Sequence, residues 1–238
     1  MDPAGRLQIV RERIAVACDR AGRDPAKVTL LAVSKGQAPE MVQAFAGLGV
    51  IHFGENKVQE AKAKIPLCSS HLRWHMIGHL QTNKSRDAVH LFEMIHSVDS
   101  LALAEEINDR AGQSAKTMPI LLEINLAGEA SKFGYRPDQL LKELDSINTL
   151  KRVEIQGLMT VAPWTPDPER VRPIFHQLRE LKDRCESILG GPLPHLSMGM
   201  SGDFDVAIQE GATIIRIGTA LLGPRSSARG AKAEAKPL

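Results

Sequence analysis

The stretch VTLLAVSK, residues 28–35, is a nearly continuous apolar run that ends in a serine and a lysine. Such a run is typical of a β-strand that is buried on both faces, as in a parallel sheet covered by helices. Further apolar runs of strand length follow along the chain, separated by stretches with helical spacing. These strands are expected at residues 50–56, 72–78, 92–98, 118–126, 153–161, 195–198 and 212–218.

Helical patterns fill the intervals between these runs. The clearest pattern covers residues 168–189, where apolar side chains recur at helical spacing from Val171 to Ile188. A further helix at residues 6–21 precedes the first strand. The remaining helices are expected at 39–48, in a short segment ending at Lys64, from about Thr82, at 101–112, from Pro137 to about Ile147, from Asp203 to about Gly211, and at Thr219.

Eight strands that alternate with eight helices favour a (β/α)8 barrel, the TIM barrel, with an extra N-terminal helix. An open doubly wound α/β sheet is the main alternative. That fold usually carries a GxGxxG turn after its first strand, whereas this strand ends in Ser34, Lys35 and Gly36. We therefore predict an α/β protein with one barrel domain over residues 1–223.

Composition and charge narrow the class of protein. Of the 238 residues, 43% are hydrophobic and 24% are charged, as in ordinary globular proteins, and no apolar run is long enough to cross a bilayer. Residues 223–238 carry a net charge of +3, which leaves −1 for the rest of the chain. We expect a basic, disordered tail at 224–238, and a body without the basic stripe that nucleic-acid-binding proteins carry.

The cysteines and the N-terminus bear on location. Cys18, Cys68 and Cys185 are odd in number, and their spacings match no metal or redox motif. Reduced thiols are usual in the cytosol, and the charged N-terminus does not resemble a signal peptide. The sequence therefore predicts a cytoplasmic protein, without a membrane or nucleic-acid partner, and we expect it to be a monomer.

Lys35 is the first candidate for chemistry, because active sites of barrels gather at the carboxyl ends of the strands. A lysine at the mouth of a buried strand lies in a medium of low dielectric constant. This environment lowers the pKa of its amine and allows a Schiff base with an aldehyde. The alternative is a lysine whose stem packs on the barrel while its ammonium reaches water, and the sequence supports it equally.

A second candidate feature is a pair of loops that follow the last two strands. They are SMGMSGD at residues 197–203 and RIGT at residues 216–219. Each leads into a helix, so backbone N–H groups and the hydroxyls of Ser201 and Thr219 can bind a phosphate. Ordinary turns and helix caps would produce either loop alone. Two such loops on adjacent strands, together with a strand-end lysine, favour a phosphorylated aldehyde as the ligand.

Other polar and aromatic residues carry weaker signals. The histidines between residues 75 and 96 lack the spacing of metal ligands, so we predict no metal site. His75 lies within a strand and is expected to belong to the core. Glu55 is interpreted either as a general acid or base or as a cap of the following helix. Trp74 and Trp164 are expected to be packing residues.

Seven segments of the chain are distinctive as a set: LLAVSKGQAPE (30–40), HFGENKVQEAKAK (52–64), WHMIGHLQTNK (74–84), EINLAGEASKFGY (123–135), GLMT (157–160), LSMGMSGD (196–203) and IRIGTALLG (215–223). In this order they resemble the pyridoxal phosphate homeostasis proteins, also described as the YggS/PROSC family, and they span most of the chain. The sequence is also similar to the barrel domain of alanine racemases, which share this cofactor architecture.

The resemblance implies a fold-type III barrel that binds pyridoxal 5′-phosphate, with Lys35 holding the cofactor as an internal aldimine. It places Arg216 by the pyridine nitrogen, and Asn56 and His79 near the ring or its hydroxyl. The residues that it assigns to the phosphate are Met200, Ser201, Gly218 and Thr219. Three positions depart from the common family pattern, with Gly36 in place of threonine, Gly202 in place of aspartate and His79 in place of proline.

An arginine beside the pyridine nitrogen keeps that nitrogen unprotonated, so the ring accepts electrons poorly. Alanine racemases bring a second base from a C-terminal β domain, and we expect no such domain after Gly223. The resemblance therefore implies a non-catalytic cofactor carrier in intracellular pyridoxal phosphate homeostasis. A single-domain amino-acid racemase is the runner-up, and a barrel that binds a phosphorylated sugar through an aldolase-type Schiff base is the third hypothesis.

Overall fold

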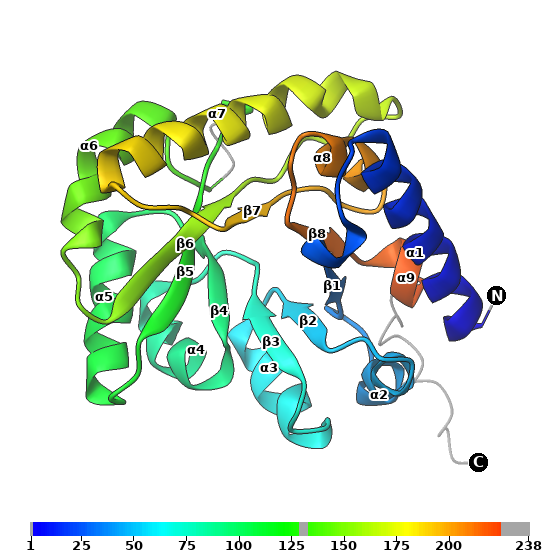
Figure 1. Cartoon of the computed structure of the whole chain (residues 1–238). Helices are drawn as coiled ribbons and strands as arrows, with labels where there is room; N and C mark the ends of the chain where they lie inside the picture. Colours follow the sequence, from blue (N-terminus) through cyan, green and yellow to red (C-terminus); the bar gives the residue numbers. More distant parts are fainter. Residues whose placement is uncertain (1, 129–132, 225–238) are drawn as a thin grey trace, which may run out of the picture.

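The computed structural model describes residues 2–128 and 133–224 and confirms the predicted (β/α)8 barrel (Figure 1). Eight parallel strands close in chain order, and β8 pairs with β1 in a register that sets Leu31 against Arg216. The strands are β1 Thr29–Val33, β2 His52–Glu55, β3 Arg73–Met76, β4 Met94–Val98, β5 Met118–Glu123, β6 Val153–Met159, β7 His195–Ser197 and β8 Ile214–Ile217.

Helices surround the barrel, and the extra N-terminal helix α1, Pro3–Arg20, packs against α8 and α9 (Figure 1). Asp2 caps α1 by accepting a hydrogen bond from the Gly5 backbone N–H at 2.8 Å. The other helices are α2 Pro39–Gly47, α3 Val58–Lys64, α4 Ser85–Leu91, α5 Leu101–Gln113, α6 Pro137–Asn148, α7 Arg172–Leu189, α8 Phe204–Gln209 and α9 Thr219–Leu222.

Two predicted helices begin later than the sequence pattern suggested. Residues 168–171 and 82–84 form 3₁₀ turns, and the α-helices start only at Arg172 and Ser85. In the first turn the apolar spacing already includes the buried Val171, because this spacing reports which side chains are buried and not which hydrogen-bond ladder the backbone forms. The second turn, Thr82–Lys84, has no buried residue.

The observed strands are likewise shorter than the apolar runs that predicted them. The first strand ends at Val33, two residues before Lys35, and the last ends at Ile217. Residues such as Ser34 and Thr160 lie beyond the strands yet remain buried. These positions form the rim at the carboxyl end of the barrel, where a polar site can be built.

The core has two parts. The larger part lies between the strands and the surrounding helices, and it includes Trp74, which packs as predicted with 4% of its surface exposed. A separate apolar cluster consists of Leu31, Met94, Leu121, Met159 and Ile214. All five are buried and lie on strands or at their ends, as expected for side chains that fill the inside of a barrel.

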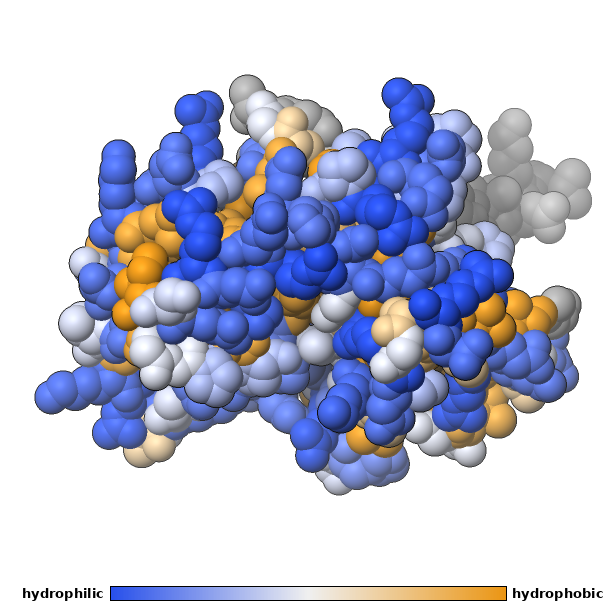
Figure 2. Space-filling model, turned by 45° about the horizontal axis from the view of Figure 1, so that its top comes forward, coloured by the Kyte–Doolittle hydropathy of each residue, from blue (hydrophilic) through white to orange (hydrophobic). Residues whose placement is uncertain are grey.

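The outer surface is mostly hydrophilic, with small apolar patches between charged side chains on the face shown in Figure 2. The helices are amphipathic, and their buried positions recur at helical spacing, as in α7 with Phe175, Leu178, Leu181 and Cys185. In the described part of the chain, no helix combines the length and the apolar composition needed to cross a membrane.

Candidate cofactor site

A cavity of about 550 Å³ lies at the carboxyl end of the barrel, where the loops after β1, β2, β3, β6, β7 and β8 meet. Seven of the eight residues that the sequence analysis assigned to the site line this cavity: Lys35, Asn56, Met200, Ser201, Arg216, Gly218 and Thr219. Because parallel strands all end at the same rim, residues far apart in sequence converge here.

The backbone around Lys35 is held from both sides by one ion pair. The Lys64 Nζ atom donates a hydrogen bond to the Ser34 carbonyl oxygen at 2.7 Å. The Gly36 backbone N–H donates to Glu60 Oε1 at 2.6 Å, and Lys64 and Glu60 are joined at 2.8 Å. The residues before and after Lys35 are therefore tied to the same helix, α3.

Glu55 completes this arrangement from the end of β2. Its fully buried Oε1 atom accepts hydrogen bonds from Lys64 Nζ at 2.6 Å and from Ser34 Oγ at 2.7 Å. Burial raises the pKa of the Glu55 carboxyl, and the hydrogen bonds from Lys64 and Ser34 oppose this rise. We call the set of Ser34, Glu55, Glu60 and Lys64 the Lys64 clamp.

The sequence interpretation of Glu55 as a helix cap is wrong. The N-cap residue of α3 is Lys57, which makes no side-chain capping bond, and Glu55 turns inward to Lys64 instead. It is also absent from the residues that line the cavity. Glu55 therefore supports the loop that carries Lys35.

Arg216 lies inside the barrel at the cavity, with only 4% of its surface exposed. Its Nη1 atom donates to Ser197 Oγ and its Nη2 atom donates to the Thr160 carbonyl oxygen, both at 2.7 Å. Burial lowers the pKa of Arg216 to about 10, although the Glu123 and Asp203 carboxylates oppose the shift. The guanidinium is therefore charged at neutral pH and fixed from two directions.

Glu123, at the end of β5, is a charged neighbour of Arg216 that the sequence analysis did not single out. Burial raises the pKa of Glu123 to about 7, Asp99 adds to the rise, and Arg216 opposes it. Its Oε2 atom is buried without a hydrogen-bond partner among the described residues. Its place at the end of a strand was the only sequence signal that could have found it.

The loops after β7 and β8 lie against each other. The Ala220 backbone N–H donates to Ser201 Oγ at 3.4 Å and so joins the two loops. Asp203 is buried and accepts a hydrogen bond from the Met200 backbone N–H at 2.5 Å, which holds the first loop in shape. Hydroxyl groups and backbone amides are thus presented together, as a phosphate group requires.

A further observation shows that the cavity suits a polar ligand. The Oδ1 atom of Asn56 is buried and has no hydrogen-bond partner among the described residues, although its side chain borders the cavity. The donor set, with an amine, hydroxyls and a guanidinium, fits a phosphorylated aromatic aldehyde.

His79 is the one assigned residue that does not line the cavity. Its ring stacks on Phe133, with 3.5 Å between ring centroids, and its Nδ1 atom lies 3.1 Å from Asp99 Oδ2. These contacts hold the His79 ring, on the loop that follows β3, against residues that follow β4 and β5. Its expected place near the ring of a cofactor stays a prediction.

The prediction that Trp164 is a packing residue is wrong. Its side chain is 86% exposed and borders the cavity beside Val161 and Thr165. Trp164 lies on the loop that follows β6, beyond the end of the strand. Hydrophobicity alone misplaced the residue, whereas its position beyond a strand end was the informative signal.

Comparisons with known proteins agree with this geometry. The family model for the N-terminal domain of alanine racemase matches residues 6–226. The pyridoxal phosphate homeostasis protein of Aquifex aeolicus (strain VF5) is 45% identical over 226 residues, which cover 94% of this chain and 99% of that protein.

Solved structures show the same architecture. PipY of Synechococcus elongatus PCC7942, in a structure with PLP bound, is 38% identical with a TM-score of 0.81, covering 90% of this chain and all of that one. An alanine racemase of Clostridium difficile 630 is 15% identical with a TM-score of 0.72 and shows the fold alone, with 91% of this chain covering 56% of that one. The chain belongs to the family of pyridoxal phosphate homeostasis proteins and carries the alanine racemase N-terminal domain.

Proposed function

We propose that this protein binds pyridoxal 5′-phosphate in the cavity at the carboxyl end of the barrel. In this proposal Lys35 holds the cofactor as a Schiff base, and the protein is a non-catalytic carrier in intracellular pyridoxal phosphate homeostasis. The observation that carries the proposal is the clamped backbone of Lys35 at a cavity that also contains Arg216. The names of the relatives and the PLP bound to PipY support the same ligand.

In this proposal, residues that line the cavity hold different parts of the cofactor. Ser201, Thr219 and the backbone around Met200 would bind the phosphate, and Lys35 would supply the amine for the aldehyde. A guanidinium has five N–H donors, so Arg216 keeps donors for the ring nitrogen beyond the two bonds that fix it. A bound cofactor supplies an electron-accepting ring, and an arginine partner keeps that ring a weak acceptor.

The titratable groups at the cavity support a carrier more than a catalyst. In the described chain, those that line it are Lys35, Asp203 and Arg216. Asp203 is occupied by the Met200 backbone N–H, and the pKa of Arg216, near 10, is too high for a base at neutral pH. The chain has one tyrosine, Tyr135, and it is fully buried. Neither Asp203 nor Arg216 is therefore suited to act as a general base at neutral pH.

The remaining parts of the proposal concern the setting in which the carrier works. We propose a cytoplasmic monomer without a nucleic-acid partner, which the three unpaired cysteines and the near-neutral charge of residues 1–222 support. We also propose that residues 1–223 form the cofactor-binding unit. The expected disordered tail at 224–238 lies outside the described residues, apart from Pro224.

Absorption spectroscopy and hydrogen exchange together test the proposed function. Purified protein is incubated with pyridoxal phosphate, and amino acids are then added in D₂O while α-hydrogen exchange is followed by NMR. We expect a new visible absorption band, a spectral change on adding amino acids, and exchange at the background rate. The control is a Lys151→Ala variant, which removes an exposed lysine in the turn before β6.

Two results would overturn the proposal in different ways. A protein that gives no visible band with pyridoxal phosphate, yet binds a phosphorylated sugar, would favour the aldolase-like hypothesis. Fast α-hydrogen exchange that disappears in Lys35→Ala but not in Lys151→Ala would establish the racemase instead of the carrier.

A further inference from the structure

A single file of hydrogen-bonded side chains crosses the inside of the barrel. His52 Nδ1 lies 3.0 Å from His75 Nε2, and His75 Nδ1 lies 3.0 Å from His96 Nε2. His96 Nδ1 lies 3.0 Å from Ser197 Oγ, which accepts a hydrogen bond from Arg216 at 2.7 Å. We call His52, His75, His96 and Ser197 the histidine chain.

Strand register explains why these residues meet. His52 is in register with Arg73, and His75 is in register with Met94. Each histidine therefore lies two residues, or one inward-facing position, further along its strand than the histidine before it. From His52 to His96, each ring therefore lies closer to the carboxyl end of the barrel, as the tilt of the strands allows.

The positions of the hydrogens follow from Arg216, because a guanidinium can only donate. Ser197 Oγ accepts from Arg216, so its single hydrogen is available for His96 Nδ1. His96 must then carry its own hydrogen on Nε2 and donate it to His75, which donates in the same way to His52. The reverse direction would leave the Ser197 hydrogen without an acceptor among the described residues.

The imidazole rings of the histidine chain are also uncharged. Burial lowers the pKa of His75 to about 3 and holds the pKa of His96 well below its ordinary value, and the neighbouring histidines act in the same direction. Arg216 also lowers the pKa of His96. A charged imidazole next to the buried guanidinium would be repelled, whereas a neutral one provides both a donor and an acceptor.

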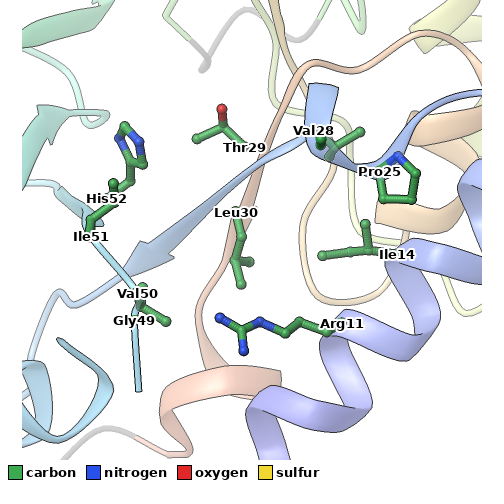
Figure 3. Close-up of a pocket in the computed structure, with 11 residues that line it drawn as sticks. Arg11, Ile14, Pro25, Val28, Thr29, Leu30, Gly49, Val50, Ile51 and His52 are labelled. Atoms are coloured by element: carbon green, nitrogen blue, oxygen red, sulfur yellow. The ribbon is translucent and has the colours of Figure 1, made fainter. Parts of the chain in front are cut away.

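The far end of the chain reaches the amino end of the barrel. His52 is half-buried there and borders a second cavity of about 380 Å³, which Arg11, Val28 and Thr29 also line (Figure 3). The histidine chain thus connects this second cavity to the cavity at the carboxyl end of the barrel, where Arg216 lies. Among the described residues, no group of three or more His, Cys, Asp or Glu residues is arranged to hold a metal ion. The histidines instead follow one another in a line.

We propose that the histidine chain is a positioning device for Arg216. By fixing the tautomers of three neutral rings, it turns the Ser197 hydrogen away from Arg216 and always presents an oxygen lone pair to the guanidinium. Together with the Thr160 carbonyl, this oxygen holds Arg216 in place for the cofactor's ring nitrogen, a role that rests on the proposed function. His52, His75, His96 and Ser197 are therefore positioning residues.

NMR of the protein without cofactor tests whether the histidine chain has the proposed tautomers and hydrogen bonds. Protein labelled with ¹⁵N-histidine gives the tautomer of each ring from two-bond ¹⁵N–¹H correlations, recorded near pH 7.5. We expect neutral His75 and His96 with the hydrogen on Nε2, and a scalar coupling between His75 Nδ1 and His96 Nε2 across their hydrogen bond. A hydrogen on Nδ1 of either ring, or a charged ring, would overturn the proposal.

Two conservative variants of His96 then test its action on Arg216. In His96→Asn the amide oxygen can replace Nδ1 and still accept from Ser197, whereas His96→Gln can replace only Nε2. We expect His96→Gln to weaken pyridoxal phosphate binding about tenfold, the size of a lost hydrogen bond to a charged group, and to shift the absorption band. We expect His96→Asn to stay near the wild-type affinity, as should the exposed control His90→Gln.

The NMR measurement and the binding measurements distinguish the proposed function from the proposed role of the histidine chain. If wild-type protein failed to bind pyridoxal phosphate, the proposed function would fail, while the tautomers would still decide whether the chain exists. Equal affinity and identical spectra for the Gln variant and wild type would show that His96 does not position Arg216. Ser197→Ala is the second variant, with the same tenfold loss expected, and melting curves confirm that each variant is folded.

Discussion

Two buried polar networks support the two ends of the same cavity by opposite electrostatic means. The Lys64 clamp is ionic, with one ammonium between the carboxylates of Glu55 and Glu60, and it fixes the backbone beside Lys35. The histidine chain is neutral and fixes the guanidinium of Arg216. Both are largely buried, where a polar group without a partner is costly, and Glu55 Oε2 is the one clamp atom that is buried without a hydrogen-bond partner among the described residues.

The difference follows from what each network has to hold. The clamp holds backbone groups, so it can contain charges of opposite sign that attract one another. The histidine chain ends on a buried cation, and a second cation there would be repelled. Imidazole suits that place because its neutral form offers one donor and one acceptor at the pH where the protein works.

The largest expected effect comes from breaking the ionic network. Lys64→Met should lower the free energy of unfolding by about 3–5 kcal/mol, because it leaves the Glu55 carboxylate buried without its cation. Lys62 lies on the same helix as Lys64, and Lys62→Met removes an exposed ion pair to Asp87 on α4, which should cost under about 1 kcal/mol. Urea unfolding measures both values, and equal losses would show that the clamp does not depend on burial.

The two networks should fail in different pH ranges. His75 and His96 have pKa values below that of an unfolded histidine, near 6.5, so the unfolded state binds more protons as the pH falls. Each ring should therefore cost about 2 kcal/mol of stability between pH 7 and pH 5. In the Lys64 clamp, burial raises the pKa of Glu60 but hydrogen bonds from Lys64 and Gly36 lower it overall, so the contribution of Glu60 is lost only below pH 4.5. Burial raises the pKa of Glu55, so its protonation favours the folded state as the pH falls.

Urea unfolding of wild type and His96→Asn across pH 8 to 4 measures this separation. The raised pKa of Glu123 acts in the opposite direction, because its protonation below pH 7 favours the folded state. Charges near the rings, on Arg73, His195 and Arg216, are the same in both proteins. The difference between the two proteins therefore isolates one ring. Parallel pH profiles would contradict a neutral, buried His96.

Two ligands, one with and one without an aldehyde, can distinguish the roles of the two networks. Glu60→Ala removes the acceptor of the Gly36 N–H and should weaken pyridoxal phosphate binding about threefold, the size of an ordinary hydrogen bond. It should leave binding of 4′-deoxypyridoxine 5′-phosphate unchanged, since that analogue has no aldehyde for Lys35. His96→Gln should weaken both ligands. Titration calorimetry gives the affinities, and equal losses for both ligands in Glu60→Ala would break the distinction.

The smallest effect is expected where neither network is touched. A chain that ends after Pro224 keeps the hydrogen bonds from Gln37 to the carbonyl oxygens of Gly223 and Pro224. Its melting temperature and its spectrum with pyridoxal phosphate should match those of the full chain. A clear drop in either would show that residues 225–238 contribute to the fold or to the site.

The fold could be predicted because burial repeats regularly along the chain. Apolar runs such as residues 28–33 gave all eight strands, and the convergence of strand ends at one rim brought seven assigned residues to one cavity. The ends of the elements were less accurate, since side chains such as Ser34 stay buried beyond the hydrogen-bond ladder.

The two polar networks could not be predicted from the sequence. Lys64 occupies the last turn of a helix, where a lysine is usually solvated, and only the packing of α3 against the loop after β1 brings it to Glu55. The histidine chain depends on the relative register of separate strands, which no local pattern encodes. His75 was correctly placed in the core, but its partners were not foreseeable.

The site of covalent attachment decides whether Lys35 is the residue that holds the cofactor. Wild-type protein is loaded with pyridoxal phosphate, reduced with borohydride, digested and analysed by mass spectrometry, with the other lysines of the chain as internal references. We expect the reduced cofactor on the peptide that contains Lys35, and we expect Lys35→Ala to lose the reducible adduct. Attachment at another lysine, or an undiminished adduct in Lys35→Ala, would contradict it.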